Sequence, residues 1–145
     1  MRRHKLTGLC GAFLLLFSTI LPLSKMNGTN ITILPLFNNF VINNVWEWIN
    51  ISAFAITYII SVVVCIWLII EKKYVGIFIS ASAIAFVSLI IFMGILISKV
   101  NASPDALNNF SISWGWIIIL LGILLVYFSG FRMLKQVRTN GQKKV

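Results

Sequence analysis

Four long apolar runs dominate the pattern of hydrophobic and polar positions along the chain. They cover residues 6–23, 48–70, 74–98 and 114–131. Each run is close to the roughly 20 residues that a helix needs to cross about 30 Å of hydrocarbon. The pattern therefore predicts an all-α fold, a four-helix transmembrane bundle that forms a single integral membrane domain over residues 1–145.

Polar segments separate the predicted spans. Residues 24–47 and 99–113 form two longer loops, residues 71–73 form a tight turn, and residues 132–145 form a basic tail. Because Lys and Arg in short loops are retained in the cytoplasm, the positions of the cations predict the orientation. Ten of the 12 cations lie before the first span, in the turn or in the tail. Both termini are therefore predicted to be cytoplasmic.

Tryptophans support this orientation. Trp46 and Trp48 precede the second span, and Trp114 and Trp116 begin the fourth. Tryptophan concentrates at membrane–water interfaces, so these side chains are expected at the outer interface.

Composition narrows the class of protein. The chain is 59% hydrophobic and 10% charged, with only three acidic residues. These values indicate a multi-pass membrane protein and exclude a water-soluble enzyme. We expect the protein in the cell membrane. A basic start followed by an apolar run also describes a secretory signal peptide, and its cleavage would leave three spans. No small-x-small cleavage site follows Leu21-Pro22-Leu23, so an uncleaved first span is the favoured interpretation.

The four predicted spans contain no Asp, Glu, Lys, Arg or His. Embedded ionisable groups mark proton relays and ion-coupled transporters. A small multidrug antiporter, for example, needs a carboxylate in its first helix. His4 precedes the first span, so it is not expected to bind haem iron inside the bundle. We expect no catalytic residue, no metal site, no cofactor and no enzymatic activity.

Two cysteines lie in the inner halves of the first two spans. Cys10 and Cys65 are interpreted as packing residues, and acylation near the inner interface is the alternative.

Small residues recur at spacings that let helix backbones approach closely. Two explanations remain open: these faces pack the four helices against one another, or they bind other membrane helices in a homo-oligomer or a larger complex. The candidate positions are Gly8, Gly11, Ala12, Gly76, Ser80, Ala81, Ala85, Gly94, Ser98, Gly115 and Gly122.

The predicted outer loops are rich in Asn and carry Asn-x-Ser/Thr sequons. Sequons on the outer side are candidate N-glycosylation sites. Asn27, Asn30 and Asn101 are the candidates. Asn50 is a poor candidate because it lies at the membrane edge, and Asn109 because it lies in a short loop.

The tail spaces its cations as Arg132, Lys135 and Arg138. This spacing would continue the fourth helix and direct positive charge at anionic lipid headgroups. No aromatic residue after Phe131 could stack on bases, so nucleic acid is not an expected partner.

In layout the chain resembles the claudin-like group of small four-span proteins. The likeness rests on a first span ending in Leu21-Pro22 and on a Trp-led, Gly-containing last span. The claudin pattern also has a Gly-Leu-Trp and two cysteines in its first outer loop, whereas this loop has Trp46 and neither of those features. The resemblance implies an architecture with both termini inside. Because the loop motif is missing, an adhesive or paracellular function is not carried over to this chain.

These observations predict a non-enzymatic structural or accessory subunit of a membrane complex. The alternative is a passive pore or holin-like homo-oligomer, which would need a polar stripe along its lumen. Thr57, Ser61 and the serines of the third span would supply that stripe if they faced a common lumen.

Overall fold

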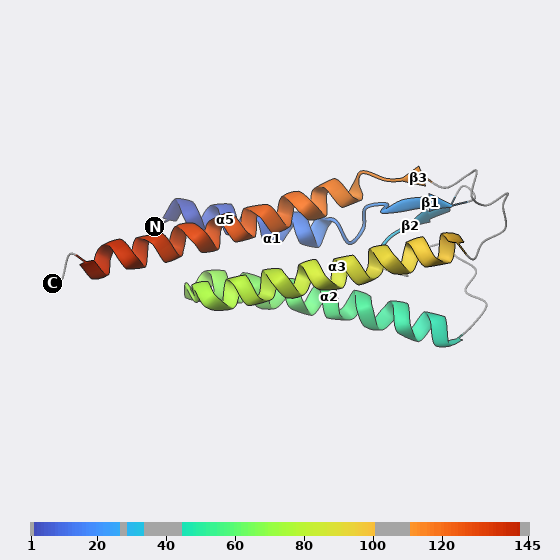
Figure 1. Cartoon of the computed structure of the whole chain (residues 1–145), viewed down its shortest axis with the longest axis horizontal. Coiled ribbons are helices and arrows are strands. Elements are labelled where there is room, and N and C mark those ends of the chain that lie inside the picture. The colour runs from blue at the N-terminus through green and yellow to red at the C-terminus, as the bar shows by residue number, and fades with distance from the viewer. Residues whose placement is uncertain (1, 27–28, 34–44, 101–110, 143–145) are drawn as a thin grey trace.

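A computed structural model shows four helices and one small sheet in the residues it describes, which are 2–26, 29–33, 45–100 and 111–142. The order is α1 (Arg2–Phe17), β1 (Ser24–Met26), β2 (Thr29–Ile31), α2 (Val45–Glu71), α3 (Tyr74–Val100), β3 (Ser111–Ile112) and α5 (Gly115–Gln142). The helices run side by side in an elongated bundle, with both chain termini at one end and the sheet at the other (Figure 1). We call these the basic end and the sheet end. The predicted four-helix bundle is confirmed.

Three of the described helices are long and apolar enough to cross a membrane, through Ala53–Glu71, Tyr74–Ile95 and Gly115–Val137. Helix α1 has 16 residues and contributes only a shorter apolar stretch, His4–Phe17. At a rise of about 1.5 Å per residue, α1 spans roughly 24 Å, less than the hydrocarbon thickness. The apolar helices identify a membrane protein.

Helix α1 begins and ends earlier than the run at 6–23 predicts. The hydroxyls of Ser18 and Thr19 donate to the carbonyls of Leu15 and Leu16, each at 2.7 Å. Helix continuation would also require an N–H from Pro22 to the Ser18 carbonyl, and proline has none. The chain instead leaves α1 in a tight turn, in which Thr19, Ile20 and Leu21 donate backbone bonds three residues back. These bonds satisfy backbone groups that lipid could not.

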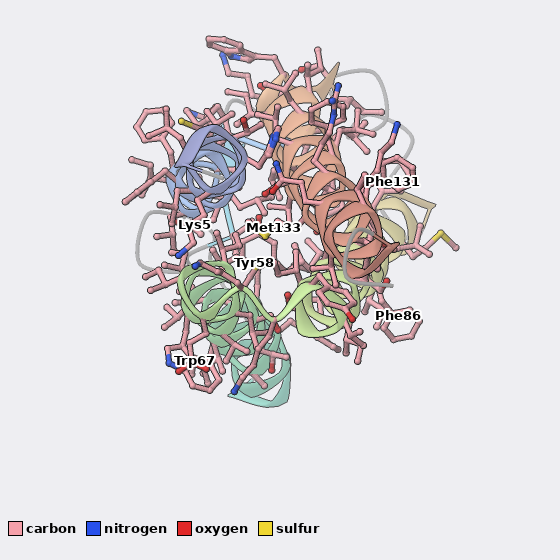
Figure 2. All side chains as sticks on the ribbon, turned by 90° about the vertical axis from the view of Figure 1, so that its left-hand side faces the viewer. Lys5, Tyr58, Trp67, Phe86, Phe131 and Met133 are labelled. Carbon is pink, nitrogen blue, oxygen red and sulfur yellow. The ribbon has the colours of Figure 1, made fainter. Side chains whose placement is uncertain are left out.

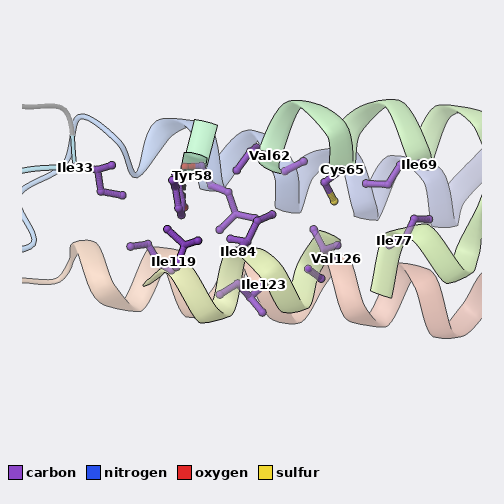
Figure 3. Close-up of a cluster of buried hydrophobic side chains, with 14 of the residues drawn as sticks. Ile33, Tyr58, Val62, Cys65, Ile69, Ile77, Ile84, Ile119, Ile123 and Val126 are labelled. Carbon is purple, nitrogen blue, oxygen red and sulfur yellow. Dashed lines mark hydrogen bonds between the residues drawn. The ribbon is translucent and has the colours of Figure 1, made fainter. Parts of the chain in front are cut away.

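The four helices enclose an apolar interior. Helix α1 packs mainly on α5, and α2 packs mainly on α3. Leu15 is among the fully buried side chains between them. Tyr58, Ile69, Ile84 and Val126 are others (Figure 3). Trp67, Phe86 and Phe131 point away from the bundle (Figure 2). Large apolar side chains on the outside suit a surface that faces lipid rather than water.

The predicted outer loops at 24–47 and 99–113 meet in one antiparallel sheet of order β2-β1-β3. Lys25 of β1 lies opposite Asn30 on one side and Ser111 on the other. The sequence pattern did not reveal these strands, because two or three residues are too few to show an alternating period. Asn27-Gly28, which separates β1 from β2 in the sequence, is the dipeptide typical of two-residue hairpin turns and could have indicated the pair.

A buried hydroxyl pair joins α2 to the end of α1. The Tyr58 hydroxyl lies 3.1 Å from the Ser18 hydroxyl and 3.3 Å from the Leu15 carbonyl oxygen. Tyr58 and Ser18 are both fully buried. The pair therefore fixes where the non-helical exit from α1 sits against the second helix.

Substituting Tyr58→Phe is expected to lower the free energy of unfolding by about 0.5–1.5 kcal/mol, because it deletes the hydroxyl and leaves the ring in place. Chemical unfolding in detergent micelles would measure the loss. Thr57→Val is the matched control, since the Thr57 hydroxyl bonds only the Ala53 carbonyl of its own helix. Equal stability of Tyr58→Phe and wild type would contradict a stabilising role for the hydroxyl pair.

Candidate functional site

The first and last helices touch through their backbones at two glycines. A Cβ atom added to Gly11 would lie 2.8 Å from the carbonyl oxygen of Gly122. One added to Gly122 would lie 3.0 Å from the carbonyl oxygen of Gly11. Ala12, beside this contact, is fully buried. Only small residues permit so close an approach of two helices.

Two further glycines bring α5 close to α1 and to the segment that follows α1. A Cβ on Gly8 would lie 2.5 Å from the Ser129 hydroxyl oxygen, and one on Gly115 would lie 2.5 Å from the Pro22 carbonyl oxygen. The Ser129 hydroxyl donates to the His4 carbonyl at 2.7 Å. The candidate small residues of α1 and α5 are therefore used within the chain.

Most candidate residues of α3 also face the bundle. A Cβ on Gly76 would lie 2.8 Å from the Leu68 side chain across the α2–α3 turn. Ser80 and Ala81 are buried, and Ala85 packs partly buried against the core. These residues hold α3 in place.

Gly94 differs from the other candidate glycines, because nothing lies within 4 Å of a Cβ added there. Ala83, eleven residues earlier in α3, is exposed. Eleven residues correspond to about three helical turns, so both positions lie on one side of the helix. Ile79 and Phe86 are also exposed there, and we call these four residues the outer α3 face. Ser98 lies in α3, but its side chain is outside the described part.

The sequon candidates are placed only in part. Asn30 is an exposed residue of β2 at the sheet end. Asn27 and Asn101 fall outside the described residues.

The hydroxyls considered for a pore stripe fall in separate places. Ser82 is exposed, and its hydroxyl lies 2.6 Å from the Tyr127 hydroxyl. Thr57 and Ser61 donate to the carbonyls of Ala53 and Thr57 within α2, and Thr57 is exposed. Ser80 and Ser88 are buried in the bundle. Among the described residues of one copy of the chain, these hydroxyls do not share a lumen.

The basic end is organised around the C-terminus of α2. Lys72 has a φ of 62°, the left-handed conformation that usually holds glycine after a helix. Its N–H donates to the Ile69 carbonyl at 3.3 Å, and that of Lys73 donates to the Leu68 carbonyl at 3.0 Å. This Schellman arrangement satisfies two of the terminal carbonyls. Lys5 of α1 donates to a third, that of Ile70, at 2.6 Å.

Other cations at this end have aromatic or acidic neighbours. Lys73 pairs with Glu71 at 2.8 Å and lies 4.8 Å from the ring centre of Trp67. Arg132 lies 5.0 Å from the ring centre of Phe128. Helix α5 continues to Gln142, so the stretch with the Arg132 and Lys135 spacing is helical as predicted.

No chemistry-bearing cluster emerges from the described residues. Among them, no group of His, Cys, Asp and Glu could hold a metal ion. Cys65 is buried in the core, and Cys10 is exposed on α1. What the described part of the chain offers is therefore a set of packing faces and a basic end.

Comparison with known protein families, with curated proteins and with solved structures finds no match to the chain.

Two glycine substitutions should behave in opposite ways. Gly11→Ala would force α1 away from α5, because the new methyl group meets backbone, and is expected to cost about 1–3 kcal/mol. Gly94→Ala meets no neighbour and is expected to be neutral or to stabilise α3 by up to about 1 kcal/mol. Unfolding midpoints of both variants in the same detergent would test this. An equal loss of stability in both would show that Gly94 is also packed within the chain.

Proposed function

We propose that this protein is a non-enzymatic structural or accessory subunit of a membrane complex and that it binds a partner helix through the outer α3 face. The observation that carries the proposal is the contrast between Gly94 and the other candidate glycines. Gly8, Gly11, Gly76, Gly115 and Gly122 each meet neighbouring atoms of this chain, whereas nothing lies near Gly94.

Glycine destabilises a helix by about 1 kcal/mol relative to alanine, so an exposed helical glycine lowers the stability of the isolated chain. In lipid, where apolar side chains gain little by leaving the hydrocarbon, small residues stabilise helix pairs by letting backbones come into contact. Ala83 and Gly94 lie about 16 Å apart along α3, which is long enough to support such a crossing.

The bundle interior supports a packing role. Apolar side chains fill it from Ile119 near the sheet end to Ile69 and Ile77 near the basic end (Figure 3). A conducting path would therefore have to form between copies of the chain. A homo-oligomeric pore is the alternative that flux measurements address.

The double variant Ala83→Leu/Gly94→Leu is expected to abolish co-purification of a partner, or self-association, after mild detergent extraction. Both positions are exposed, so the bundle itself should still form. Ala53→Leu, at an exposed alanine of α2, is the matched control. Ser80→Leu is less suitable, because Ser80 is buried and its replacement would disturb the core. Complexes that survive the double variant would argue against the outer α3 face.

Liposomes containing the purified protein are expected to retain a trapped fluorescent dye, because a packing subunit provides no aqueous path. Dye release over empty liposomes would be measured by dequenching. Leakage that depends on protein concentration would favour the pore instead.

A further inference from the structure

We propose that the α2–α3 turn at the basic end binds the headgroup of an anionic phospholipid, with the ammonium groups of Lys5 and Lys72 facing its phosphate. The proposal does not depend on the partner-binding role, because it concerns a different end of the molecule and a lipid ligand. It also differs from a general attraction of anionic lipids to the basic tail at 132–145, since the lipid is held at one defined turn.

The turn lies at the depth of lipid headgroups. The apolar stretch of α2 ends at Glu71, and that of α3 begins at Tyr74. Lys72 and Lys73 are the only residues between these two spans. Trp67, about one turn inside α2, is 50% exposed and points away from the bundle (Figure 2). Tryptophan takes this position at membrane interfaces, so the lysines beyond it sit where phosphates are found.

The charges of the turn leave a net positive site. Glu71 is already paired with Lys73. The first turn of α3 contains no acidic residue. Lys5 uses one bond on the Ile70 carbonyl, and an ammonium group has three donors. Lys5 therefore retains donors for a ligand while its position is held against the end of α2.

Lys72 occupies a backbone conformation in which glycine would be less strained. Its ammonium forms no salt bridge within the described part of the chain. The cation is thus exposed at the α2–α3 turn, two residues after the Ile70 carbonyl that Lys5 bonds, and is available to a group from outside the chain.

The surroundings favour a lipid over a soluble anion. Exposed apolar side chains lie directly on the membrane side of the lysines: Trp67, Ile70 and Val75. A ligand that carries both a phosphate and acyl chains would contact the cations and these side chains together. A free phosphate would contact only the cations.

Lys72→Gly provides a sharp test, because it deletes the charge and relieves the backbone strain. The full-length chain would be reconstituted in phosphatidylcholine bilayers with and without phosphatidylglycerol, and its unfolding temperature followed by tryptophan fluorescence. Wild type is expected to gain thermal stability with phosphatidylglycerol. Lys72→Gly is expected to unfold at a higher temperature than wild type in pure phosphatidylcholine. Its gain from phosphatidylglycerol should fall to about half, since one of two cations near the surface is lost.

Two further variants separate a site from diffuse attraction. Lys5→Gln removes the second cation while keeping a donor for the Ile70 carbonyl, and it should also reduce the gain. Lys135→Gln, at an exposed lysine of α5, should leave most of the gain intact. Equal gains in wild type and Lys72→Gly, or equal reductions in Lys72→Gly and Lys135→Gln, would overturn the proposal.

Inorganic phosphate added to the phosphatidylcholine sample distinguishes the two sources of the anion. No stabilisation by millimolar phosphate is expected, because the acyl chains supply part of the contact. Stabilisation by phosphate equal to that by phosphatidylglycerol would overturn the lipid assignment and indicate a soluble anion.

Discussion

The packing of α1 on α5 is the interaction on which the other features of this bundle depend. Because Gly11 and Gly122 let the two backbones touch, the first and last helices lie together along their length. β1 follows α1 and β3 precedes α5, so this contact also brings the two strands side by side at the sheet end. The residues that follow the short α1 contact α2 through Ser18 and Tyr58, and α5 through Pro22 and Gly115. These contacts let α1 end inside the bundle.

The same contact explains how small residues are divided between internal and external use. Most glycines and alanines of the candidate faces are needed to bring helices of one chain together. Gly94 and Ala83 are exposed on the outer side of α3, so neither is needed for a contact between helices of the same chain. Whether a small residue packs within its own chain or is available to a partner can be decided only from the tertiary structure. This distinction moves the candidate partner surface from α1 and the inner side of α3 to the outer α3 face.

At the basic end, the lysines differ in what they do, although all carry the same charge. Lys5 stabilises the end of α2 through a carbonyl, and Lys73 is engaged by Glu71 and Trp67. Lys72 holds the left-handed position of the turn and is exposed. A count of cations predicts an orientation in the membrane, whereas the hydrogen bonds of the turn indicate which cations remain for a ligand.

The sequence by itself determined the four apolar helices, the tight α2–α3 turn and the gathering of cations near both termini, because bilayer thickness and charge retention act on runs of residues that are local in the chain. It also predicted the helical continuation past Arg132 from the spacing of the cations. The end of α1 at Phe17, the sheet joining two distant loops, and the contact between Gly11 and Gly122 were decided by tertiary structure. Each of these depends on atoms brought together from segments far apart in the chain, and no local pattern records which face of an apolar helix will meet another helix and which will meet lipid.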